Sequence, residues 1–205
     1  MQDSAPFEPP ISLVVGLGNP GSVYEGTRHN LGFYLLGTWV RQRREKWRYE
    51  PKFQAEVASI LLGSKKIFCL KPQTFMNQSG ISVQAFCAYH HVEPTAVLVV
   101  CDDISIPFGQ WKVSTIPGTA GHNGVKSVAA SIGNGFIRYR VGLGTKPALM
   151  SLSDYVLSRF SEEERRQLPV IAETFERNLE VFIDKGVQKG LNEVKRYAYE
   201  HEETA

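Results

Sequence analysis

The chain of 205 residues has little cysteine and almost no net charge. Its three cysteines, Cys69, Cys87 and Cys101, are far apart and form no C-x-x-C pair. This pattern argues against a disulfide framework or a thiolate zinc site and favours a reducing compartment, for which the cytoplasm is the simplest expectation. The 23 basic and 21 acidic residues leave a net charge of only +2, so composition gives no sign of a general polyanion binder or a polybasic membrane anchor.

Long hydrophobic runs and processing signals are also missing. No apolar run approaches the roughly 18 residues that a membrane span requires, so no membrane partner is expected. Residues 1–10 contain two acidic residues and three prolines, without a basic end or an apolar core. We therefore expect a short flexible leader instead of a signal peptide, followed by one domain over residues 11–205.

Strand-like and helix-like patterns alternate along the remaining chain. A Ser-x-x-Glu capping box, Ser161 and Glu164, marks the start of one helix. The alternation predicts a single three-layer α/β domain. The predicted strands are residues 11–15, 53–62, 66–70, 97–101, 110–114 and 136–142, and the predicted helices begin at residues 31, 79, 123, 161 and 190.

The sequence does not match the common signatures of nucleotide-binding proteins and hydrolases. Gly16, Gly18 and Gly21 match G-x-G-x-x-G, but Pro20 and further loop residues separate them from the next helix, so a dinucleotide cofactor is not expected. The glycine-rich stretch 118–127 lacks the Gly-Lys pair of a phosphate-binding loop. There is also no G-x-S-x-G elbow and no H-E-x-x-H helix.

Four turn-rich segments, most of them at predicted strand ends, carry polar residues that suit hydrolysis. In an open α/β sheet such segments face one crevice. A neutral imidazole can take a proton from water, a carboxylate can hold the imidazole, and amide N–H groups can hold an oxyanion, which favours direct attack of water on an ester. The residues are Asn19, Tyr24, His29, Asn77, Asp102, His122 and Asn123.

Structural roles compete with this interpretation. Asparagines in loops commonly serve turns and caps, and Asn123 is well placed as a helix N-cap. Asp102 and Asp103 can simply solvate a strand end, and Phe75 can belong to the core. Among the histidines, His29 at a helix entrance is the candidate base.

Three ordered motifs identify a resemblance. They are Gly16–Gly32 (G-L-G-N-P-G-x-x-Y-x-x-T-R-H-N-x-G), Lys71–Gly80 (K-P-x-T-F-M-N-x-S-G) and Gly121–Gly124 (G-H-N-G). Together they resemble the bacterial-type peptidyl-tRNA hydrolase family over nearly the whole chain. The resemblance implies a mixed sheet flanked by helices and an esterase that releases a stalled peptide from tRNA. It also implies a monomer without metal or cofactor and without an obligate protein partner.

The resemblance also implies roles for single residues. His29 matches the general base, Asp102 its supporting acid, and Asn19 the asparagine that distinguishes a blocked amino group. An amide accepts from a peptide N–H but meets a protonated amine poorly, which suits that role. The implied substrate contacts are Tyr24, Phe75, Asn77 and Asn123.

The chain departs from the family pattern at several positions. Cys101 and Asp103 flank Asp102 where the family often has a histidine and a glutamate, and Ala120 stands where the family usually has a glycine. Of a basic pair that grips a tRNA phosphate, Arg140 is present, but a serine, Ser114, occupies the lysine position. Lys112, two residues earlier on the same face of the predicted strand, can supply that charge.

Basic residues outnumber acidic ones before Ser161, and acidic residues outnumber basic ones after it. A basic body carrying Lys126 and Arg138 is therefore expected to meet the tRNA.

The sequence leaves two alternative functions open. One is a non-enzymatic RNA-splicing accessory of organelles with the same fold. The other is a hydrolase of another acylated RNA or of a small ester.

Overall fold

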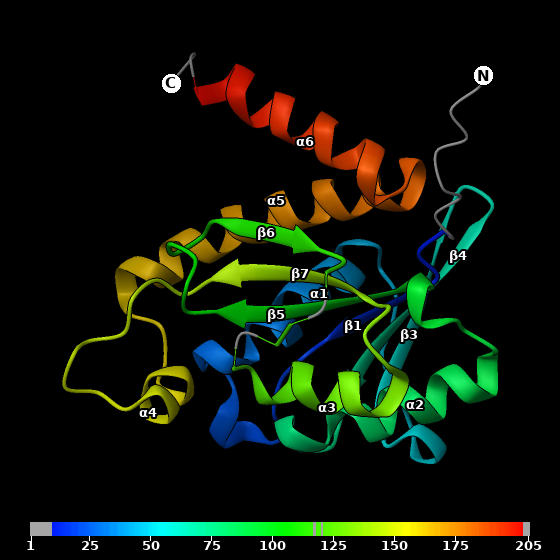
Figure 1. The fold of residues 1–205 in the computed structure, drawn as a ribbon, viewed down its shortest axis with the longest axis horizontal. Coiled ribbons are helices and arrows are strands. Elements are labelled where there is room, and N and C mark those ends of the chain that lie inside the picture. The colour runs from blue at the N-terminus through cyan, green and yellow to red at the C-terminus, as the bar shows by residue number, and fades with distance from the viewer. Residues whose placement is uncertain (1–9, 117, 120, 203–205) are drawn as a thin grey trace.

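The computed structural model describes residues 10–116, 118–119 and 121–202. Its centre is one seven-stranded sheet in the order β2-β3-β4-β1-β5-β7-β6 (Figure 1). Four parallel strands, β4, β1, β5 and β7, form the middle, and antiparallel strands complete both edges. The strands are β1 (Leu13–Gly16), β2 (Arg48–Glu50), β3 (Ala55–Leu62), β4 (Lys65–Pro72), β5 (Val97–Asp103), β6 (Trp111–Ser114) and β7 (Ile137–Gly142).

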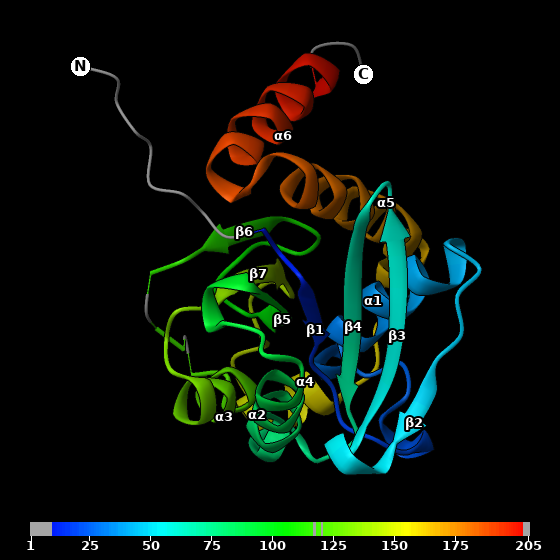
Figure 2. The same cartoon turned by 90° about the vertical axis from the view of Figure 1, so that its right-hand side faces the viewer.

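Helices cover both faces of this sheet, which confirms the predicted three-layer α/β fold (Figure 2). One face carries α2 and α3, and the other carries α1 and α5, with α6 packed on α5. The helices are α1 (Leu31–Gln42), α2 (Ser79–His90), α3 (Asn123–Ile132), α4 (Leu152–Leu157), α5 (Glu162–Lys185) and α6 (Val187–Glu202). No helix in this part of the chain is both long and apolar enough to cross a membrane.

Alternating side chains of the central strands build the two cores. Leu13 and Val15 of β1 pack toward α2 and α3, whereas Val14 between them packs toward α1 and α5. Successive residues of a strand point to opposite faces, so a strand covered on both sides is apolar throughout. The short apolar runs at residues 11–15 and 97–101 are therefore buried strands, as predicted.

Most predicted elements are confirmed, and several boundaries move. The helices at residues 79–90 and 123–132 and the capping box of α5 occur as expected. The last helix begins at Val187 instead of residue 190, and the prediction missed β2 and α4 altogether. These two elements have three and six residues, too few to show a period. The proposed leader lies outside the described residues except for Pro10.

Close packing at two glycines brings α1 onto the ends of β1 and β5. A Cβ atom on Gly32 would lie 2.5 Å from the Val100 carbonyl oxygen and 2.6 Å from the Leu17 nitrogen. A Cβ atom on Gly16 would lie 2.6 Å from the Gly32 oxygen. Such contacts leave room only for glycine. As a result, the segment just before α1, which contains His29, lies against the carboxyl end of β5.

Candidate active site

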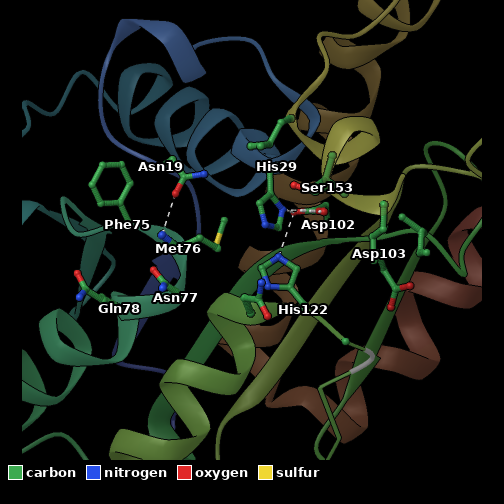
Figure 3. Close-up of a pocket in the computed structure, with 16 residues that line it drawn as sticks. Asn19, His29, Phe75, Met76, Asn77, Gln78, Asp102, Asp103, His122 and Ser153 are labelled. Atoms are coloured by element: carbon green, nitrogen blue, oxygen red, sulfur yellow. Dashed lines mark hydrogen bonds and ion pairs between the residues drawn. The ribbon is translucent and has the colours of Figure 1, made fainter. Parts of the chain in front are cut away.

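The carboxyl ends of the parallel strands open into a cleft of about 800 Å³ (Figure 3). Its walls come from the loops after β1 and β4, the end of β5, the start of α3, and α4. The predicted convergence of the strand-end segments is confirmed, because parallel strands end at the same edge of a sheet. Six predicted site residues line the cleft: Asn19, His29, Phe75, Asn77, Asp102 and Asn123.

His29 and Asp102 form a buried pair at the base of this cleft. The Nδ1 atom of His29 lies 2.9 Å and 3.1 Å from the two carboxylate oxygens of Asp102. Since a carboxylate can only accept, Nδ1 carries the proton and Nε2 keeps its lone pair. His29 Nε2 makes no hydrogen bond to the described residues, and the side chain lines the cleft. The imidazole is therefore arranged as a base toward the cleft.

A second imidazole contacts the same carboxylate; it belongs to His122, which the sequence analysis counted among the polar candidates but gave no role. His122 Nε2 lies 3.1 Å from Asp102 Oδ1. Its Nδ1 accepts from the backbone N–H groups of Gly124 at 3.1 Å and Val125 at 3.3 Å. These bonds fix the tautomer, so Nε2 donates to Asp102. The Gly-His-Asn-Gly motif was the available signal, but it did not reveal that the histidine faces the aspartate.

The same bonds correct the predicted cap of α3. His122, not Asn123, is the N-cap residue, because its side chain accepts from the first helical N–H groups. Asn123 is thereby free of the capping role, and it is exposed at the cleft.

Asp102 is held in its ionised form. Burial opposes ionisation, but the charges and hydrogen bonds of His122 and His29 outweigh it and keep the pKa of Asp102 well below its usual range. The neighbouring Asp103 points elsewhere: it accepts from Ser105 N at 2.8 Å and from Arg140 Nη1 at 3.0 Å. Only one of the two adjacent carboxylates therefore serves the histidines.

Cys101, one of the departures from the family pattern, is not available as a nucleophile. It is buried, with 2% of its surface exposed. Burial raises the pKa of its thiol far above the ordinary value, and the nearby Asp102 and Asp103 raise it further. The residue is a packing group of β5 and does not supply a thiolate to the cleft.

Asn19 is fixed from three directions. Its backbone N–H donates to Asn30 Oδ1 at 2.8 Å, and its carbonyl accepts from Asn30 Nδ2 at 2.9 Å. Its side-chain Oδ1 accepts from the Met76 N–H at 2.8 Å. The side-chain amide nitrogen is then left to point toward His29 (Figure 3). The sequence-based interpretation used Asn19 as an acceptor, whereas this geometry presents a donor to the cleft.

Two further amides and an aromatic ring border the opening. Asn77 and Asn123 are exposed and make no side-chain hydrogen bond within the part of the chain that the structure describes. Phe75 is 54% exposed, which argues against a core role. Its ring lies 6.3 Å from that of Tyr24 in an edge-to-face arrangement. Tyr24 is half-buried and supports Phe75 from outside the cleft.

The predicted phosphate contacts lie on β6 and β7, outside the cleft. Lys112 is directly opposite Arg140, and Ser114 is directly opposite Arg138, so the four side chains share one face of the ribbon. Arg138 is buried and donates to Ser114 Oγ at 3.1 Å. Lys112 is exposed, and its register places it beside Arg140.

His29, Asp102 and His122 form the one group of potential metal ligands found among the described residues, with ligand atoms within 4.8 Å of one another. The ring nitrogens that face Asp102 already share hydrogen bonds with it. A metal ion at this point would have to replace those bonds. Without a metal ion, the two imidazoles and the carboxylate already form one hydrogen-bonded cluster.

Comparisons with known proteins agree on one family. The family model described as peptidyl-tRNA hydrolase matches residues 13–203. The peptidyl-tRNA hydrolase of Dichelobacter nodosus is 38% identical over 183 residues, covering 89% of this chain and 97% of the relative. That of Desulfitobacterium hafniense is 38% identical over 186 residues, covering 89% and 98%. The crystal structure of the Acinetobacter baumannii enzyme superimposes with a TM-score of 0.84 at 30% identity, covering 90% and 94%.

Proposed function

This chain belongs to the peptidyl-tRNA hydrolase family, and we propose that it cleaves the ester between a peptide and the 3′-terminal ribose of tRNA with His29 as the general base. The observation that carries this proposal is the buried His29–Asp102 pair at the base of a cleft. The enzyme acts on peptidyl-tRNA, and the residues given below are our assignment of its parts.

The reaction begins with water in the cleft. His29 Nε2 takes a proton from water as the oxygen attacks the ester carbonyl carbon, and Asp102 stabilises the imidazolium that forms. The tetrahedral intermediate then collapses. The bond from the carbonyl carbon to the ribose oxygen breaks, and the leaving oxygen receives the proton from His29. The products are a free peptide acid and a tRNA with its terminal hydroxyl restored.

Three amides surround the place where negative charge develops. We assign the side-chain N–H groups of Asn19, Asn77 and Asn123 to the carbonyl oxygen and the adjacent peptide groups. Asn19 is the most rigid of these because Met76 and Asn30 hold it, and a preorganised donor is worth more than one that must reorient. A free aminoacyl group offers fewer peptide partners to these amides, which provides a basis for sparing aminoacyl-tRNA.

The tRNA contacts extend beyond the cleft. Phe75, supported by Tyr24, presents an exposed ring on which a base or a peptide side chain can stack. Arg140 of β7 and Lys112 of β6 are assigned to backbone phosphate. We place the enzyme in the cytoplasm as a monomer that needs no cofactor, in keeping with three buried cysteines that are all unpaired.

Release of an N-acetylated amino acid from tRNA, measured beside release of a free amino acid, tests this function. We expect rapid hydrolysis of the blocked substrate and little of the free one. His29→Ala should lower kcat by about 10²–10⁴-fold, because the general base is lost. Full activity of this variant would refute the base, and equal rates on both substrates would refute the selectivity. Absence of hydrolysis would instead favour an RNA-binding accessory role.

A further inference from the structure

Arg28, the residue before His29, is a buried cation that takes no part in the chemistry above. Its side chain is 10% exposed and that of Glu164 is 20% exposed. Both carboxylate oxygens of Glu164 accept from Arg28 Nη2, at 2.8 Å and 2.6 Å. The guanidinium carbon also lies 4.7 Å from the ring centre of Tyr155 and 5.3 Å from that of Phe160. The two Nη atoms and the face of the guanidinium are therefore held by the α4–α5 region.

The backbone reinforces this attachment. The Arg28 N–H donates to the Ser158 carbonyl oxygen at 2.9 Å, and Thr27 pairs with Arg159 in an isolated bridge. Arg28 Nη1 adds bonds to the Ser158 hydroxyl at 2.9 Å and to the Arg159 carbonyl. The segment before His29 thus behaves as part of the α4–α5 connection, although about 130 positions of sequence separate them.

His29 lies between two such anchors. Arg28 ties one side of the short helical turn Arg28–Asn30 to the α4–α5 connection, and Asn30 ties the other side to Asn19. Leu152, Ser153 and Val156 of α4 line the same wall of the cleft as this turn, and Ser153 lies beside His29 (Figure 3). Arg28 therefore joins the turn that carries His29 to the segment that carries α4.

We propose that the Arg28–Glu164 ion pair is a positioning device, which holds His29 on Asp102 and keeps α4 against the cleft. The inference rests on the proposed function, since it concerns the geometry of that reaction. A displacement of about 1 Å in a catalytic group can lower the rate about 10²-fold. Removing one partner of a buried ion pair leaves the other charge uncompensated, so the segment must rearrange.

Glu164 also has a purely structural role, which the test must distinguish from its ion pair with Arg28. Its carboxylate accepts from the Ser161 N–H at 2.6 Å, and Ser161 Oγ accepts from the Glu164 N–H at 3.2 Å. These bonds form the capping box of α5. Glu164→Gln keeps a side chain that can complete the box but removes the charge that faces Arg28. Ser161→Ala weakens the same box and leaves the ion pair, so it is the matched control.

Steady-state kinetics on N-acetyl-aminoacyl-tRNA is the first measurement. We expect Glu164→Gln to lower kcat about tenfold, with KM within about threefold of the wild type. Arg28→Lys should behave in the same way, because an ammonium group cannot reproduce the planar contacts. Ser161→Ala should stay within about twofold of the wild-type kcat, even though it lowers the melting temperature. Equal kcat values for Glu164→Gln and the wild type would overturn the positioning role while the proposed function stands.

Hydrogen–deuterium exchange of the intact protein supplies a readout that does not need activity. Peptides covering residues 152–158 should exchange faster in Glu164→Gln than in the wild type, and Ser161→Ala should leave them unchanged. Identical exchange in Glu164→Gln and the wild type would overturn the proposal. If the wild-type protein failed to hydrolyse the substrate, the proposed function would fail, and exchange alone would decide whether the ion pair holds α4.

Discussion

At the scale of single residues, the site depends on how one carboxylate is shared. Asp102 receives N–H groups from His29 and His122 and is 4% exposed. Two donors keep the anion stable in a place where burial alone would disfavour it. His29 is the member of this trio with a ring nitrogen left for the cleft, because His122 uses both of its nitrogens. These contacts are why His29, and not His122, is our candidate base.

The variant Asp102→Asn tests how the two histidines and the Asp102 carboxylate depend on each other. Both its activity and its stability in acid are measured. The variant should lose about 10²–10⁴-fold in kcat, because nothing then stabilises the imidazolium. The folded-state pKa of Asp102 is lowered below its unfolded value of about 3.9. Its contribution to stability is therefore fully present above that unfolded pKa and is lost as pH falls through the lower folded value.

Urea unfolding of the wild type and of Asp102→Asn, repeated from neutral to acid pH, measures this contribution to stability. The difference in free energy of unfolding between the wild type and Asp102→Asn should be largest near neutral pH and should shrink as the solution is acidified below about pH 4. A difference that does not change with pH would contradict the assigned electrostatics. The activity assay at neutral pH provides the independent check on the catalytic role.

At the scale of elements, α3 shows how a contact to the proposed supporting acid and the start of a helix are combined. One imidazole caps the helix with Nδ1 and donates to Asp102 with Nε2. Sequence rules favour asparagine as a cap over histidine, which is why Asn123 was the predicted cap. The loop instead places His122 so that the ring spans from the helix end to β5. Local propensity could not reveal this, because the deciding partner lies 20 positions away.

A pair of alanine variants distinguishes the two residues. His122→Ala should lower the free energy of unfolding by about 1 kcal/mol or more, since it removes the cap and a partner of Asp102. Asn123→Ala should change stability by less than about 0.5 kcal/mol, because its side chain is exposed and unbonded to the described residues, while lowering kcat/KM. Thermal or chemical denaturation checks the first result. The opposite order of stabilities would restore Asn123 as the cap.

At the scale of the whole molecule, the net charge is near zero, but basic and acidic residues are unevenly distributed. Lys112, Lys126 and Arg140 belong to the body around the sheet, whereas α5 begins with three consecutive glutamates, Glu162–Glu164. Lys112 of β6 and Arg140 of β7 lie side by side. A protein of this kind can attract nucleic acid through one region without being basic overall.

Salt dependence of KM tests this uneven distribution of charge. For an N-acetyl-aminoacyl-tRNA substrate, KM should rise with salt, and Lys112→Ala or Arg140→Ala should reduce the slope of log KM against log salt by about one each. Lys189→Ala removes the same charge from the exposed surface of α6 and should leave the slope unchanged. A salt-independent KM, or equal effects of all three variants, would contradict the assigned tRNA face.

The layered α/β fold, the clustering of polar groups at strand ends and the family could all be predicted from the sequence, because they depend on local periodicity and on contiguous motifs such as Gly16–Gly32. Three features became visible only in the folded chain: the hydrogen bond of His122 to Asp102, the donor that Asn19 presents, and the anchoring of Arg28 by Glu164. Each joins residues that are far apart in the chain, so their geometry exists only once the sheet and helices have packed.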